Sequence, residues 1–183
     1  MILLDKYREL YSIIVYICIK KSQFLNELYL KVIDLDIFMG KTVTTYLIDG
    51  DPKGTQYAFI SNKICQMFVV PRSNLSYLNT QEKLQNPAFY ILRGEDESTK
   101  PQAYIGETEN FKERVKDHDS KKSFWQKALI FVSKDADMTK VDVQYLEHKA
   151  IAEAKKANAF VLSDNKQIPK APNLPEHQQD SMN

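Results

Sequence analysis

The order of strand-like and helix-like segments between residues 86 and 165 constrains the fold most strongly. Two runs rich in aromatic and β-branched residues, 89–93 and 102–105, flank a polar stretch at 94–101. This spacing predicts a β-hairpin with a fairly long loop. A third run, ALIFVS at 128–133, is apolar enough to form a buried strand.

Two helix starts complete the pattern. Asn110 and Thr139 are each followed three residues later by an acidic residue, Glu113 and Asp142, as in a capping box. The first helix is expected to run to about His118 and the second to about Ala157. The order is therefore β-β-α-β-α. It predicts a mixed α/β (α+β) domain with a three-stranded antiparallel sheet flanked by helices.

The remaining sequence divides by composition. Strand-like runs at 41–48, 57–60 and 64–70 predict a small β-rich segment. Asp49 and Asp51 lie in a turn rich in Gly and Pro, where carboxylates cap backbone groups more often than they bind metal. The expected division is an unassigned extension at 1–38, the β-rich segment at 39–80, the α/β domain at 86–165 and a disordered tail at 166–183.

Composition excludes several classes of protein. A net charge of +1 gives no global basic footprint of the kind seen in many nucleic-acid binders. Cys18 and Cys65 are expected to be ordinary core residues in a reducing cytosol. The apolar run Leu10–Ile19 is shorter than the ~20 residues of a membrane-spanning helix. We therefore expect a cytoplasmic protein without a membrane segment.

A set of polar residues in the α/β domain could converge on a phosphate. Arg114 and His118 are four residues apart and share a helix face, and Arg offers a bidentate fork for phosphate oxygens. Tyr90 and Tyr104 lie on the two hairpin strands, and Glu147 borders the apolar face of the last helix. Singly, these residues also fit a solvated helix face, packed tyrosines and a salt-bridged glutamate.

The same residues carry a resemblance to a known family. The strings PAFYIL at 87–92, AYIGET at 103–108 and FKERVKDH at 111–118 resemble the GIY-YIG nuclease superfamily. That family expects a later glutamate, matched by Glu147, and an asparagine, matched best by Asn165 and less well by Asn158. Residues 41–78 also resemble a segment that precedes this module in a bacterial subgroup.

The first motif departs from the family pattern. Ala88 and Phe89 replace its Gly and Ile, although the Tyr remains. The added methyl group of Ala88 is expected to narrow the cleft. Every polar residue of the pattern is present, which favours an active enzyme.

The resemblance implies a divalent-metal-dependent endonuclease that hydrolyses DNA phosphodiester bonds. In this mechanism Glu147 holds Mg²⁺ or Mn²⁺, Arg114 offsets charge on the phosphate, Tyr104 orients the phosphate or water, and Asn165 supports the site. The general base stays open between Tyr90 and His118. A Tyr pKa of about 10 and a His pKa near 6.5 make His118 the easier base on magnitude alone.

Two alternatives remain from the sequence. One is a catalytically inactive GIY-YIG-fold module that binds nucleic acid without cleaving it. The other is a structural domain in which the tyrosines only pack. That second alternative predicts buried hydroxyls on Tyr90 and Tyr104, and no cleft that joins them to Glu147.

Overall fold

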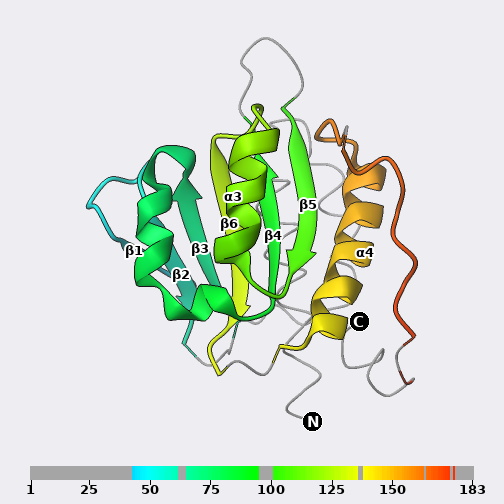
Figure 1. Cartoon of the computed structure of the whole chain (residues 1–183), viewed down its shortest axis with the longest axis horizontal. Coiled ribbons are helices and arrows are strands. Elements are labelled where there is room, and N and C mark those ends of the chain that lie inside the picture. Colours follow the sequence, from blue (N-terminus) through cyan, green and yellow to red (C-terminus); the bar gives the residue numbers. More distant parts are fainter. Residues whose placement is uncertain are drawn as a thin grey trace.

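The computed structural model defines a single sheet with helices on both of its faces (Figure 1). It describes residues 43–61, 65–94, 101–135, 138–162, 164–173 and 175. The expectations for residues 1–38, including Cys18 and the apolar run 10–19, lie outside the described residues, as does the end of the tail from residue 176.

The secondary structure follows the predicted order. Both helices begin at the residue after the predicted cap. The elements are β1 (Val43–Leu47), β2 (Gln56–Ile60), β3 (Cys65–Pro71), η1 (Arg72–Thr80), η2 (Glu82–Gln85), β4 (Ala88–Arg93), β5 (Ala103–Thr108), α3 (Phe111–Lys121), β6 (Lys127–Ser133) and α4 (Lys140–Ala157). No helix in the described part of the chain is long and apolar enough to span a membrane.

The predicted number of three strands is wrong. The sheet has six strands, in the order β1-β2-β3-β6-β4-β5. All neighbours pair antiparallel. β6 pairs with β4 on one side and with β3 on the other, so Ile130 lies between Tyr90 and Phe68. The β-rich segment therefore extends the sheet of the α/β domain, and β6 is its buried centre.

The two faces of the sheet carry separate cores. Tyr90 and Leu92 of β4 point to the face where α3 contributes Phe111 and Val115. Phe89 and Ile91 point to the opposite face, where α4 packs through side chains that include Val143, Leu146 and Ile151. In Figure 1, α3 crosses the front of the sheet and α4 lies beside β5. The alternation of side chains along β4 thus assigns Tyr90 to the α3 face.

Side-chain caps fix where both helices begin. Asn110 Oδ1 accepts a hydrogen bond from the Glu113 amide at 3.3 Å. Thr139 and Asp142 form a full capping box, in which each side chain accepts from the other residue's backbone amide. The start of α3 at Phe111 places Arg114 and His118 one turn apart, on the side that faces the hairpin.

The structure bears on two smaller expectations as well. Asp49 Oδ2 accepts from the Thr55 amide at 3.0 Å, and Asp51 Oδ1 accepts from the Lys53 amide at 2.8 Å. Both carboxylates therefore cap the turn before β2. Cys65 is buried at the start of β3, as expected for a core residue.

Candidate active site

A hydrogen-bonded cluster of three side chains lies between the hairpin and α3. The hydroxyl oxygen of Tyr90 is 2.7 Å from Nε2 of His118. Arg114 Nε donates to the same oxygen at 3.3 Å. Tyr90 is 0% exposed and His118 is 3% exposed, while the Arg114 side chain reaches solvent. The structure therefore brings together three of the predicted residues, two of them shielded from water.

Gly106 leaves room for this cluster. It pairs with Tyr90 across the hairpin. A Cβ at Gly106 would lie 2.6 Å from the Tyr90 hydroxyl, 2.7 Å from its Cζ and 2.9 Å from Cε1 of Tyr104. The third residue of the YIG motif must therefore be glycine, because any side chain there would collide with the two tyrosine rings.

Burial keeps Tyr90 and His118 uncharged, whereas Arg114 carries its positive charge. It raises the pKa of Tyr90 well above the usual value, with Tyr104 adding to the shift and Arg114 opposing it. It lowers the pKa of His118 to about 4, helped by the positive charges of Arg114 and Lys122. Both Tyr90 and His118 are therefore neutral at pH 7. Since Arg114 donates to the phenol oxygen, we assign the phenol proton to the hydrogen bond with Nε2.

Tyr104 connects the buried cluster with the molecular surface. Its ring centroid lies 5.1 Å from that of His118 and 6.2 Å from that of Tyr90. Tyr104 is only partly buried, and it lines an open cleft at the β5 edge of the sheet. The cleft has a volume of about 550 Å³ and is lined by Tyr104, Lys122, Glu147, Asp164, Asn165, Lys166, Gln167 and Pro169.

Glu147 enters the same cleft from α4. Its pKa is raised to about 7, first by burial and then by the neighbouring carboxylate of Glu107, while Lys140 and Arg114 act in the opposite direction. Glu107 is itself held by Lys140, whose Nζ lies 2.6 Å from Glu107 Oε2. If the domain had only a structural role, no cleft would be expected between the tyrosines and this glutamate. Tyr104 and Glu147 share one, although the Tyr90 side chain is buried, as that alternative expected.

Asn165 fastens the chain after α4 to the edge of β5. Its Oδ1 accepts from the Ile105 amide, and its Nδ2 donates to the Ile105 carbonyl, both at 2.8 Å. Ahead of it, Val161 forms a parallel bridge beside Gln102. Asn158, the weaker match, is the left-handed C-cap of α4 at φ 49°. Asn165 thus lines the cleft with both ends of its amide bonded to the sheet.

Ala88, the departure from the family motif, lies away from the cleft. It is fully buried in the core of the α3 face and pairs with Thr108. Its methyl group is not among the groups that line the cleft. The expected narrowing is therefore absent at this position.

Several charged residues of the site went unnoticed in the sequence. Glu107 and Lys140 are joined across β5 and α4, and Lys122 and Asp164 form an ion pair across the cleft. Glu107 lies directly beside the YIG motif, which is the one signal that could have drawn attention to it. Each pair joins residues more than 30 positions apart, so sequence spacing gives no sign of either.

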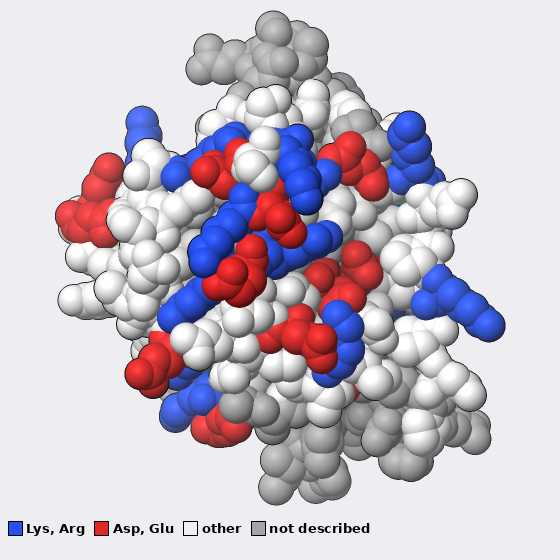
Figure 2. Space-filling view, viewed as in Figure 1, with Lys and Arg blue, Asp and Glu red and all other residues white. Residues whose placement is uncertain are grey.

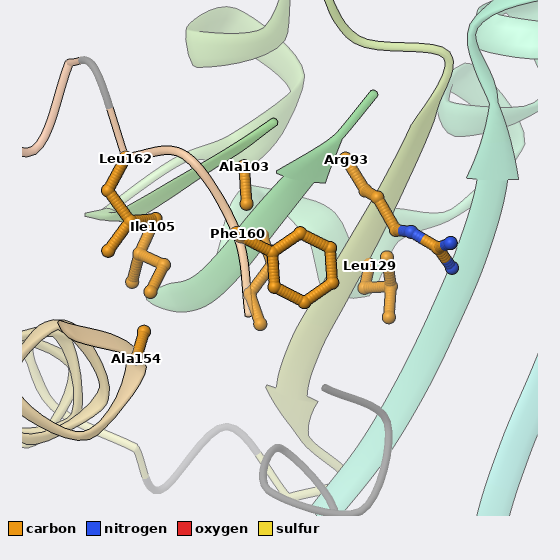
Figure 3. A pocket seen from close by; sticks show the side chains of 8 residues that line it. Arg93, Ala103, Ile105, Leu129, Ala154, Phe160 and Leu162 are labelled. Atoms are coloured by element: carbon orange, nitrogen blue, oxygen red, sulfur yellow. The ribbon is translucent and has the colours of Figure 1, made fainter. Parts of the chain in front are cut away.

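A second cavity lies on the opposite face of the sheet (Figure 3). It has a volume of about 20 Å³ and apolar walls, with Phe160 and Leu162 facing side chains of β4, β5 and β6. Such a space holds no more than a water-sized molecule. It is a packing defect of the α4 core.

Comparison with known proteins identifies the domain. Residues 86–159 match the family model of the GIY-YIG catalytic domain. The match supports membership of the GIY-YIG nuclease superfamily for this part of the chain, and it confirms the resemblance found in the sequence. Comparisons with curated proteins and with solved structures gave no significant match. GIY-YIG domains are generally nucleases, so nucleic acid is the class of substrate that the domain implies.

Proposed function

We propose that the protein is a divalent-metal-dependent endonuclease that hydrolyses DNA phosphodiester bonds. One observation carries the proposal. A neutral Tyr90–His118 pair with Arg114 lies directly behind Tyr104, and Tyr104 shares an open cleft with the carboxylate of Glu147. Groups that can transfer a proton therefore lie close to groups that can bind a metal ion or stabilise negative charge, as phosphodiester hydrolysis requires.

Glu147 fits the role of metal ligand. It is a half-buried carboxylate in an open cleft, and its raised pKa marks a site where an added positive charge would favour the ionised form. The described residues contain no group of three or more His, Cys, Asp or Glu side chains suited to a metal. Mg²⁺ often takes only one or two protein carboxylates and completes its shell with water and phosphate. When bound, Mg²⁺ or Mn²⁺ supplies Lewis-acid chemistry that polarises the scissile phosphate.

The geometry favours a shared role for the two candidate bases. Tyr90 does not ionise alone at neutral pH, because burial raises its pKa. The neutral His118 can accept the phenol proton at Nε2 while the phenol oxygen accepts a proton from the attacking water. His118 is then the final proton acceptor and Tyr90 is the relay. Because the Tyr90 hydroxyl is buried in the free protein, the relay requires the bound substrate to bring the attacking water into contact with it.

Arg114 and Tyr104 complete the assignment. Arg114 keeps part of its guanidinium exposed and can donate to a phosphate oxygen while Nε holds Tyr90. Tyr104 orients the phosphate or the water at the wall of the cleft. Asn165 supports this wall through its bonds to Ile105.

Plasmid relaxation with added Mg²⁺ or Mn²⁺ tests the proposal. Glu147→Gln and Arg114→Ala are each expected to lower the single-turnover rate by about 10²- to 10³-fold. Glu153→Gln is the matched control, because Glu153 lies on the same helix and only pairs with Lys156 at the surface.

Full activity in either site variant would refute the assigned roles. DNA binding without any metal-dependent cleavage would identify the chain as an inactive binding module of the same fold.

A further inference from the structure

Lys122, just after α3, is held in an unusual position for a lysine. Its side chain is only 19% exposed, whereas those of Lys116 and Lys121 on α3 are 66% and 72% exposed. Its Nζ lies 4.4 Å from the centroid of the Tyr104 ring and forms an ion pair with Asp164. The ammonium group is therefore fixed against a tyrosine of the proposed site.

Two exposed lysines of α3 already have partners on the same helix. On α3, Lys116 pairs with Glu113 and Lys121 with Asp117, each within one turn of the helix. Figure 2 shows blue and red side chains interleaved over this face, with no uniform basic surface. Contact with a nucleic-acid backbone is therefore expected from particular basic side chains in and beside the cleft.

The C-terminal segment (residues 160–162 and 164–169) has several anchors other than Asp164. Asn165 makes two hydrogen bonds to Ile105, and Val161 bonds to the backbone of Pro101 and Ala103. Further along, the Pro169 carbonyl accepts from His148. The segment is anchored on both sides of Asp164, so the Lys122–Asp164 pair has no unique structural task.

We propose that Lys122 binds a backbone phosphate of the substrate strand next to the scissile one, and that Asp164 occupies this phosphate position while the cleft is empty. The inference rests on the proposed nuclease function. A carboxylate and a phosphodiester each carry one negative charge and accept the same charge-assisted hydrogen bonds from an ammonium group. Asp164 is 42% exposed, more than twice the value for Lys122, so the carboxylate can turn into solvent while the ammonium stays.

The exchange predicts opposite effects for the two partners of one ion pair. Lys122→Met keeps the aliphatic stem over Tyr104 and removes the charge. It is expected to weaken DNA binding roughly tenfold at low salt, the order of one charge-assisted contact, and to reduce the salt slope by about one. Asp164→Asn removes the competing carboxylate and is expected to tighten binding a few-fold.

Fluorescence anisotropy with a short labelled duplex and the full chain measures both effects across a salt series. Lys156→Met is the matched control, because Lys156 pairs only with Glu153 on the exposed side of α4. Thermal unfolding of each variant monitors folding, and binding is compared at a temperature where all variants are folded.

A structural ion pair predicts that both variants weaken binding together, and that result would overturn the inference. An unchanged affinity and salt slope for Lys122→Met would also overturn it, while plasmid cleavage by the unaltered chain would leave the nuclease function standing. If the unaltered chain neither binds nor cleaves DNA, both proposals are wrong.

Discussion

Burial shifts the pKa values on the α3 side and the α4 side of the candidate site in opposite directions. On the α3 side, Tyr90 and His118 lie out of contact with water, and burial lowers the pKa of His118 to about 4. On the α4 side, Glu147 faces an open cleft, and burial beside Glu107 raises its pKa to about 7. His118 and Glu147 are both shifted toward their neutral forms, His118 by losing a proton and Glu147 by keeping one.

The difference teaches which partner each group needs. A neutral imidazole bonded to a phenol can take up a proton without any further ligand. A carboxyl group with a pKa of about 7 is only partly ionised at neutral pH, and a bound cation would complete its ionisation. The α3 side is thus complete in the free protein, whereas the α4 side depends on what enters the cleft.

Removing the Tyr90 hydroxyl is expected to have the largest effect, because it breaks the α3 side and leaves the α4 side intact. Tyr90→Phe should lower the single-turnover cleavage rate by about 10²- to 10⁴-fold, the range for a lost proton-transfer group. DNA affinity should change little. Tyr46→Phe, at the exposed strand β1, is the control. A Tyr90→Phe protein that cleaves at the unaltered rate would remove Tyr90 from the mechanism.

Arg72 tests whether the α3 side depends on the β-rich segment. Its guanidinium bonds to the side chain and carbonyl of Asp119 at 2.7 Å and to the Lys122 carbonyl at 3.0 Å, just beyond the end of α3. Arg72→Ala removes these charge-assisted hydrogen bonds and is expected to cost about 1–3 kcal/mol of unfolding free energy. Urea unfolding measures it.

Arg72→Lys sharpens the result, because lysine keeps the charge and loses the fork that spans several acceptors. It should restore only part of the stability. Cleavage should fall less than in Tyr90→Phe, since Arg72 acts on α3 from outside the cluster. Unchanged stability in Arg72→Ala would show that the β-rich segment does not support α3 through this side chain.

A separate expected effect is on how stability varies with pH. The folded-state pKa of His118, about 4, lies below its ordinary 6.5, so the unfolded chain binds the proton more tightly and stability falls as pH drops from 6.5 to 4. The folded-state pKa of Glu147, about 7, lies above its ordinary 4.5, so its contribution is present below 4.5 and lost as pH rises through 7.

Melting temperatures between pH 4 and 8, without divalent ions, separate the two contributions. Glu147→Gln should be more stable than the unaltered chain at pH 8 and should lack the loss near pH 7. His118→Asn should lack the loss on the acid side. Parallel curves for all three proteins would show that neither group is shifted in the folded state.

Local structure was readable from the sequence because its causes are local. Side-chain caps at Asn110 and Thr139, and short runs of β-branched residues, act within a few positions. The pairing of β3 with β6 was missed because an apolar strand buried on both sides accepts any strand of suitable register. The apolar residues at 128–133 indicated a strand with a neighbouring strand on each side, but they did not indicate which strand the second neighbour is.

The candidate site divides in the same way. Arg114 and His118 follow from helical spacing, and Tyr90 follows from its place on a predicted hairpin strand. The role of Gly106 opposite Tyr90 emerges only from the register of β4 and β5. The importance of Asn165 came from family resemblance alone, because its hydrogen bonds cross 60 positions to Ile105. Glu107, Lys122 and Asp164 had no such signal, since surface charges are common and their partners are set by tertiary packing.

The bonds between Asn165 and Ile105 also define how much chain the domain needs. The family match ends at Ala159, yet β5 is an edge strand whose outer backbone is satisfied by Val161 and by the Asn165 amide. A protein shortened at Ala159 would present bare amides and carbonyls along β5, which is the kind of edge that recruits strands from other molecules. The structural boundary of the domain therefore falls several residues beyond the family match, and a protein cut inside this boundary is expected to self-associate.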